Sequence, residues 1–423
     1  MKNRLVFDIS YFAHWQGNLT GIPRMINELA IRYEASGSCT FVCWDNTAGK
    51  FYEADFGMVS QYRGKQIEKI FIRKKSKNIL THILWFFVRV TRRLAVYRIR
   101  GMGRVSHLLA KMYFRGFKEA NFQNNDIFFI PMGEWASSQY TERLLKFSRD
   151  GGRLVQVIHD MLPLVTPQYS GHSTKIMERY CSLVLPASTL VLAVSQSTKR
   201  DINEWLSQNK LPVPHIDVFR HGEDFAFGEA SIRSNKQFME SGLKGEDFLL
   251  CVGTIEARKN HTLLYYVYKL ARKRGYSLPK LVIVGRKGWR TEDILDIIDK
   301  DPETSDQILV MKDTSDAELA WLYDNCLFSV YPSFYEGWGM PIAESIAHGS
   351  PCISSNTSSM PEIAEDLITY FDPASSDECL AAIRNLLQPG QLKAAKEKIK
   401  KFKPTTWDET FNKVDGYIKE LPA

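Results

Sequence analysis

Two glutamates and two glycines at the start of a predicted helix suit an anionic ligand that also carries hydroxyl groups. The stretch Tyr331–Gly349 reads YPSFYEGWGMPIAESIAHG, with Glu336 just before Gly337 and Gly339, and with Glu344 further on. Carboxylates accept hydrogen bonds from sugar hydroxyls, and glycines let a ligand approach the backbone closely. The stretch therefore predicts either a site for a phosphate-bearing sugar or an ordinary strand–turn–helix whose Glu344 is a solvated face residue.

The elements around this stretch place helix N–H groups beside the turn. Phe328–Tyr331 is typical of a short buried strand, closed by Pro332. Pro341 suits the first position of a helix, and Gly349 suits the position just past its end. The N–H groups of about residues 338–342, Pro341 excepted, are then free at the positive end of the helix dipole, which favours phosphate.

A basic turn and a histidine are further candidates for the same chemistry. Arg258 and Lys259 follow the predicted strand Phe248–Gly253. The pair could hold an anion, but alone it is more typical of a solvated basic turn. His159 follows the apolar strand VQVI and precedes Asp160, which suits a turn cap. It is either hydrogen-bonded structure or a group that faces a ligand at the end of its strand.

Apolar runs alternate with helical patterns through both halves of the chain, which predicts an α/β fold with mostly parallel sheets. The predicted strands are Leu5–Ile9, Thr40–Trp44, Asp126–Pro131, Arg153–His159, Thr189–Val194, Ile216–Phe219, Phe248–Gly253, Leu281–Gly285, Ile308–Met311, Phe328–Tyr331, Pro351–Ser354 and Thr369–Phe371. Two such doubly wound units would leave a cleft at the carboxyl ends of their strands, where ligands usually bind.

The length of 423 residues exceeds one ordinary core, so we expect two domains. The polar stretch 222–246 contains four glycines and is the predicted linker. We predict an N-terminal domain over 1–225 and a C-terminal domain over 226–405. An amphipathic closing helix within 406–423 is expected to pack back on the first domain.

Cysteine usage and hydropathy indicate the cellular compartment in which the protein is expected. The seven cysteines are scattered and form no CxxC pair, which predicts buried small hydrophobes in a reducing compartment and no metal-ligand cluster. The N-terminus lacks the apolar region of a signal peptide, and no apolar run reaches the ~18 residues that a spanning helix needs. We therefore expect a cytoplasmic protein.

The basic charge is confined to one segment, 61–118, which contains sixteen Lys and Arg residues and one acid. This segment carries a formal charge of +15, which leaves −8 for the rest of a chain whose net charge is +7. From Ile79 to Tyr97 an apolar helical stripe includes Phe86 and Phe87, with arginines on the other side. The pattern favours binding to an anionic membrane surface over a helical pair that caps the sheet. Nucleic acid is a weaker alternative, because no nucleic-acid-binding motif accompanies the charge.

Several motifs together resemble one enzyme family. FYEGWGMPIAESIAHGSPCI resembles the glutamate-x7-glutamate signature of retaining GT-B glycosyltransferases, glycosyltransferase family 4. CVGTIEARKNHTLL, LVIVGRKGW, VIHDMLPL and SSMPEIAEDLITYFDP resemble further segments of that family. The resemblance covers the C-terminal half and pieces of the N-terminal half. It implies two Rossmann-like domains that face a central cleft, with the basic helical insertion 61–118 in the N-terminal domain. The N-terminal domain would bind the acceptor and the C-terminal domain the nucleotide sugar.

The resemblance also implies a role for each candidate residue. The implied catalytic residues are His159, Glu336, Arg258 and Lys259. The implied donor-binding residues are Gly21, Arg258, Lys259, Glu336, Gly337, Trp338, Gly339, Met340 and Glu344. Glu336 would contact the donor sugar and Glu344 the ribose hydroxyls. Gly17 and Thr20 would lie near the donor phosphates and the acceptor, or in a plain loop.

The chain departs from the family pattern at three places. Thr254 stands where the family often has an arginine, Trp338 replaces the more usual phenylalanine, and His221 stands where an asparagine is common. The role of His221 is left open. Glu362 follows Pro361 and is interpreted as a helix-start residue.

The expected function is that of a retaining hexosyltransferase with a front-face mechanism. The donor is a nucleotide sugar, with GDP-mannose favoured and rhamnose or glucose donors open. No metal or other cofactor is expected, because no DxD-type cluster stands out. The acceptor is a lipid-linked saccharide of bacterial O-antigen, capsule or exopolysaccharide synthesis, and the protein is peripheral on the inner face of the cell membrane. A GT-B epimerase or phosphorylase, and a non-catalytic membrane-bound assembly component, are the alternatives.

Overall fold

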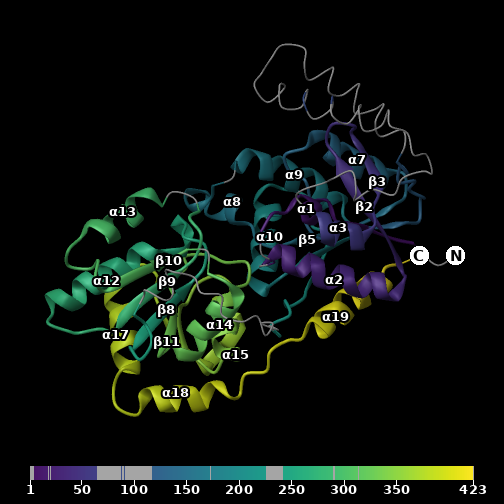
Figure 1. Ribbon diagram of the computed structural model, residues 1–423. Helices are drawn as coiled ribbons and strands as arrows, with labels where there is room; N and C mark the ends of the chain where they lie inside the picture. Colours follow the sequence, from purple (N-terminus) through teal and green to yellow (C-terminus); the bar gives the residue numbers. More distant parts are fainter. Residues whose placement is uncertain are drawn as a thin grey trace.

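The computed structural model describes residues 4–17, 19, 21–63, 87, 90, 117–171, 173–224, 242–288, 291–312 and 314–422. They form two units, each built on a parallel sheet with helices around it (Figure 1). Most of the predicted basic segment, the middle of the predicted linker, and Thr20 lie outside the described residues.

The first unit contains seven strands in the order β3-β2-β1-β4-β5-β6-β7. Their bounds are β1 Leu5–Asp8, β2 Cys39–Asp45, β3 Lys50–Glu53, β4 Ile127–Ile130, β5 Arg153–Ile158, β6 Leu190–Ala193 and β7 His215–Val218. Six of them are parallel and were predicted, whereas the edge strand β3 was not predicted and runs antiparallel to β2. Its four residues, KFYE, are too short to show a pattern of their own.

The second unit contains six strands, all parallel, in the order β10-β9-β8-β11-β12-β13. Their bounds are β8 Phe248–Val252, β9 Lys280–Val284, β10 Ile308–Met311, β11 Phe328–Tyr331, β12 Cys352–Ser355 and β13 Thr369–Phe371. The sequence predicted all six to within a residue. The apolar runs of β8 and β9 are typical of strands that are covered on both faces.

The helices cover both sheets (Figure 1). In the first unit they are α1 Ser10–His14, α2 Ile22–Ser36, α3 Phe56–Tyr62, α7 Ser138–Arg149, α8 Leu162–Val165, α9 Thr174–Ala187 and α10 Gln196–Gln208. In the second unit they are α12 His261–Lys273, α13 Glu292–Lys300, α14 Asp316–Asn325, α15 Met340–Ala347, α16 Met360–Ala364, α17 Ser376–Leu386 and α18 Gln391–Ile399. None of the described helices is both long and apolar enough to cross a membrane.

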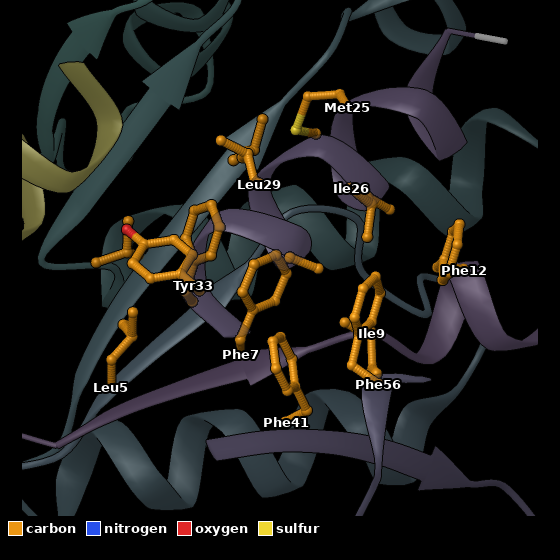
Figure 2. Packing of buried hydrophobic residues seen from close by; sticks show 14 of the residues in the cluster. Leu5, Phe7, Ile9, Phe12, Met25, Ile26, Leu29, Tyr33, Phe41 and Phe56 are labelled. Carbon is orange, nitrogen blue, oxygen red and sulfur yellow. The ribbon is translucent and has the colours of Figure 1, made fainter. Parts of the chain in front are cut away.

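Aromatic packing fixes the first sheet against its helices (Figure 2). Phe7 on β1 lies with its ring centre 5.7 Å from that of Tyr33 on α2 and 5.5 Å from that of Phe41 on β2. All three side chains are buried. Buried aromatic rings contribute large apolar areas, so this packing holds α2 against β1 and β2.

The last helix, α19 Trp407–Lys419, returns from the second unit to the first (Figure 1). It packs beside α2, where the rings of Phe411 and Tyr33 are 4.9 Å apart. Trp407 is only 4% exposed, and the Tyr417 hydroxyl donates to the carbonyl of Val218 at 3.1 Å. The core of the first unit therefore contains residues from both ends of the described chain.

We expect Trp407→Ala to lower the free energy of unfolding by about 3–5 kcal/mol, because it leaves a large cavity in the core of the first unit. Urea unfolding followed by fluorescence measures the shift. Tyr417→Phe, which removes one hydrogen bond, is the matched control and should cost about 1 kcal/mol. A Trp407→Ala protein as stable as the control would contradict this packing.

Candidate functional site

A cavity of about 450 Å³ lies between the two units and is lined by residues of both. It receives every donor-binding and catalytic candidate from the sequence. These are Gly21, His159, Arg258, Lys259, Glu336, Gly337, Trp338, Gly339, Met340 and Glu344. The candidates come from loops at the carboxyl ends of strands and from the start of α15, because parallel strands present these ends at one edge of a sheet.

The turn before α15 depends on glycine. Gly339 precedes the helix with φ 123°, a backbone conformation that residues with a side chain rarely adopt. The helix begins at Met340, so Pro341 occupies its second position and not the predicted first. Gly349 follows the helix end with φ 73°, as predicted, and its N–H donates to the carbonyl of Ile346 at 2.9 Å.

Serine hydroxyls from a separate loop hold this turn in place. Ser358 Oγ accepts from the N–H of Glu336 at 3.1 Å. Ser359 Oγ donates to the carbonyls of Glu336 and Trp338 at 2.9 and 2.5 Å. Sequence analysis missed this support, although the run SSNTSSM of short hydroxyl side chains was a signal for it.

Glu336 lies at the centre of a buried ion cluster. Its carboxylate contacts Lys259 Nζ at 2.6 Å through one oxygen and the Arg258 guanidinium through the other. Arg258 Nε also contacts Glu256 at 2.7 Å. Burial alone would raise the pKa of Glu336, but the charges of Arg258 and Lys259 outweigh burial and lower this pKa to about 2. Glu336 is therefore a carboxylate at neutral pH and acts as a hydrogen-bond acceptor.

The turn that carries the two cations is anchored on β11. Asn260 adopts a left-handed conformation with φ 57°, which asparagine tolerates well. Its side-chain amide donates to the carbonyls of Pro332 and Pro373 at 3.1 and 2.8 Å. Lys259 Nζ also contacts the Tyr331 hydroxyl at 2.6 Å. These contacts fix the cations beside residues 335–339, the turn before α15, which we call the signature turn. They are not the contacts of a freely solvated basic loop.

Glu344 is not the solvated face residue of the simpler interpretation. The Tyr323 hydroxyl donates to its carboxylate at 2.9 Å, and the side chain lines the cavity. Burial raises the pKa of Glu344, while the positive charge of Arg24, on α2 of the first unit, acts in the opposite direction. Glu344, on α15, thus presents carboxylate oxygens to the cavity from a different element than Glu336, which precedes the helix.

His159 enters the cavity from the first unit as a neutral imidazole. Its Nε2 lies 2.8 Å from the carbonyl oxygen of Pro131, which can only accept, so Nε2 carries the proton and Nδ1 is an acceptor. Burial lowers the pKa of His159 to about 4. His221, whose role the sequence left open, lines the same cavity and stacks on His159 with ring centres 6.0 Å apart. Burial lowers its pKa to about 3.

The two units touch directly around the site. A methyl group at Gly337 would lie 1.7 Å from the carbonyl oxygen of His159, so glycine is required for this close approach. The Tyr335 hydroxyl donates to Asp201 at 2.6 Å and accepts from the N–H of Met161 at 3.3 Å. Closure of the cleft and placement of the signature turn therefore depend on the same residues.

Glu362 has a larger role than the predicted helix start. Its carboxylate accepts from the N–H groups of Gln196 and Ser197, at 2.7 and 2.6 Å. These residues begin α10 of the first unit, where a negative charge is favoured by the helix dipole. Glu362 thus joins the two units, a contact that the sequence did not reveal.

The glycine loop of the first unit reaches the cavity in part. Gly21 and Trp15 line it, whereas Gly17 lines a smaller cavity of about 260 Å³ that shares Trp15. Arg286 also lines the larger cavity, and sequence analysis did not single it out. Within the described residues, no three His, Cys, Asp or Glu side chains are grouped as metal ligands would be.

Comparison with known proteins finds similarity to glycosyltransferases. Residues 234–402 match the family described as "Glycosyl transferases group 1", so the chain carries a domain of this group. The serotype-specific mannosyltransferase WbdA of Escherichia coli is 25% identical over 242 residues, which cover 55% of this chain and 29% of WbdA. O-antigen chain mannosyltransferase B of Escherichia coli is 27% identical over 237 residues, or 56% of this chain and 61% of the relative. The chain thus spans less than two thirds of these curated relatives.

Solved structures share the fold over the whole chain. Sucrose-phosphate synthase from Thermosynechococcus elongatus has a TM-score of 0.64 and 14% identity, and the match covers 99% of each chain. HepE of Anabaena in complex with UDP and glucose has a TM-score of 0.61 and 13% identity, covering 99% of this chain and 100% of HepE. The predicted GT-B fold, with two parallel-sheet domains, is confirmed.

We expect Glu362→Ala to loosen the contact between the units, because two N–H groups at the start of α10 lose a charged acceptor. Small-angle scattering should show a larger radius of gyration. Glu397→Ala, which removes an exposed glutamate of α18, is the control and should leave the radius unchanged. An unchanged radius in both variants would contradict a joining role for Glu362.

We expect the burial of neutral His159 to make the protein less stable as pH falls from about 6.5 toward 4. In this range the unfolded chain takes up a proton that folded His159 does not, so stability is lost as pH falls. His159→Gln should reduce the difference in unfolding free energy between pH 7 and pH 5 by about 1–2 kcal/mol. The exposed His215, changed to Gln, is the control. Equal pH dependence in the two variants would contradict this burial effect.

Proposed function

We propose that this protein is a retaining hexosyltransferase that moves mannose from a nucleotide sugar to a lipid-linked saccharide in bacterial surface polysaccharide synthesis. The observation that supports this most is the ion cluster of Glu336, Arg258 and Lys259, which faces neutral His159 across the cavity between the domains. Such a site offers cations to a diphosphate and hydrogen-bond acceptors to a sugar, side by side.

The donor would lie mainly on the second unit. Its diphosphate would share Arg258 and Lys259 with Glu336 and would face the N–H groups at the start of α15. Glu336 would accept hydrogen bonds from the hexose, and Glu344 from the ribose. His159 would accept a hydrogen bond from a hexose hydroxyl at Nδ1, because its Nε2–H already donates to the carbonyl of Pro131.

Transfer would proceed on one face of the sugar. Glu336 is held by two cations and is stabilised as a carboxylate, so we assign it to binding and not to nucleophilic attack. The bond from the anomeric carbon to the phosphate oxygen would break, and the acceptor hydroxyl oxygen would bond to that carbon on the same face. Its proton would pass to the leaving phosphate, whose charge Arg258 and Lys259 stabilise. We assign no cofactor to this step.

The relatives support the choice of donor and acceptor. The names of the Escherichia coli relatives describe mannosyltransferases, one of them of the O-antigen chain, and the HepE structure holds UDP and glucose. Mannose is therefore our first donor sugar, with rhamnose and glucose as alternatives, and we propose GDP as the nucleotide that carries it.

A membrane-linked acceptor agrees with the basic segment 61–118. Its positive charge and aromatic cluster suit the anionic inner face of a bacterial membrane. Two residues described within this segment are exposed hydrophobics: Phe87 is 50% exposed and Val90 is 36% exposed. We propose a peripheral association at this surface.

We expect Glu336→Ala and Lys259→Ala each to reduce transfer at least about 100-fold. Glu336→Ala removes the proposed acceptor for the hexose hydroxyls and the carboxylate that holds both cations, and Lys259→Ala removes a cation from the leaving diphosphate. Transfer from GDP-mannose, UDP-glucose and dTDP-rhamnose to a lipid-linked saccharide is measured by chromatography, and the product anomer by NMR. Lys400→Ala, at an exposed lysine, is the control. Circular dichroism verifies that each variant is folded.

Four outcomes separate the hypotheses. Full activity in either folded variant would contradict the site. Failure of wild type to bind any nucleotide sugar would contradict the function and favour a non-catalytic component. A donor epimerised without acceptor would identify an epimerase, and use of inorganic phosphate as acceptor would identify a phosphorylase.

A further inference from the structure

Arg286 lines the cavity beside the turn that carries Arg258 and Lys259. It follows β9, and the loops after β8 and β9 are hydrogen-bonded to each other. The N–H of Gly253 donates to the carbonyl of Val284 at 2.9 Å, and the N–H of Ile255 to that of Arg286 at 2.8 Å. Arg286 and the Arg258–Lys259 turn therefore belong to one group of adjacent loops, and all three side chains line the cavity.

The other two cations of the cavity belong to the ion cluster of Glu336. Arg258 and Lys259 contact the carboxylates of Glu336 and Glu256, so these four groups together carry no net charge. The diphosphate of a nucleotide sugar carries about two negative charges at neutral pH, and its binding depends on nearby cations. Arg286 is the third cationic side chain among the described residues that line the cavity, and it lies outside this cluster.

Arg286 also reaches the first unit. Its Nη1 atom would lie 2.9 Å from a methyl group at Gly17, so the guanidinium packs against the backbone of the loop before α2. Trp15 and Gly21 of the same loop line the cavity. The side chain thus extends from a strand end of the second unit to the glycine loop of the first.

We propose that Arg286 binds the diphosphate of the nucleotide sugar and, through the same guanidinium, holds the Gly17 loop against the bound donor. This proposal rests on the proposed function and assigns a donor-binding residue to it. A guanidinium presents donors on several edges, so one edge can serve the phosphates while another faces the loop. A lysine in its place would keep the positive charge but, as a compact ammonium group, could not direct donors to the phosphates and the loop at the same time.

The test compares binding of GDP, GMP and guanosine by calorimetry, using the full chain. Arg286→Ala should weaken GDP binding about 10-fold or more and leave guanosine binding unchanged, because only the phosphates lose a partner. Lys287→Ala is the matched control, since Lys287 is the next residue, is also exposed, and lines a different cavity. Its GDP affinity should stay within about 2-fold of wild type. Arg286→Lys should give an intermediate affinity.

A second measurement tests the loop. GDP should slow amide hydrogen exchange over residues 14–21 in wild type and not in Arg286→Ala, if the guanidinium joins nucleotide and loop. Arg286→Gln, which keeps the side-chain length, replaces Arg286→Ala if the latter fails to fold. Equal GDP affinities in the Arg286 and Lys287 variants would overturn the proposal, and so would a wild type that binds no nucleoside diphosphate. Wild type that binds GDP through Arg286 but transfers no sugar would overturn the proposed function alone.

Discussion

The arrangement of the cleft depends on one carboxylate held by two cations. Glu336 is buried, and only the charges of Arg258 and Lys259 make its ionised form stable there. Charged groups lose hydration on burial, so each of the three side chains is stable as an ion only while its partners are present. The serine loop, the Asn260 turn and the glycine at 339 all position members of this group. The second unit thus holds its cations and its acceptor carboxylate in fixed positions beside the cavity.

The contacts between the units converge on the same place. Gly337 meets the carbonyl of His159, Tyr335 meets Asp201, and Trp338 lies under the guanidinium of Arg220 at 5.0 Å. All three residues of the second unit belong to the signature turn. A movement of one unit relative to the other would therefore change the position of the turn, and a change in the turn would alter the contact. The relative position of the two units and the position of the signature turn are therefore linked through these residues.

Sequence reasoning found the parts of the fold that local physics decides. Buried parallel strands such as Ile127–Ile130 are continuous apolar runs, and the carboxyl ends of the strands locate the candidate residues in one cavity. Contacts between distant segments could not be predicted in this way. The edge strand β3 forms only by pairing with β2, and the partners of Glu362 and Arg286 depend on how two separately folded surfaces meet. The clustering of the site residues was foreseeable, but their partners across the cleft were not.

The path of α19 has a consequence for how the protein is made. The first unit is discontinuous in the chain, since α19 completes its core after the whole second unit has been synthesised. During translation the apolar face around Tyr33 stays uncovered until residues 407–419 leave the ribosome. An expression fragment that stops before Trp407 would expose this face and invite aggregation. Any separation of the two units for biochemical work therefore has to carry α19 with the first, joined by a new linker.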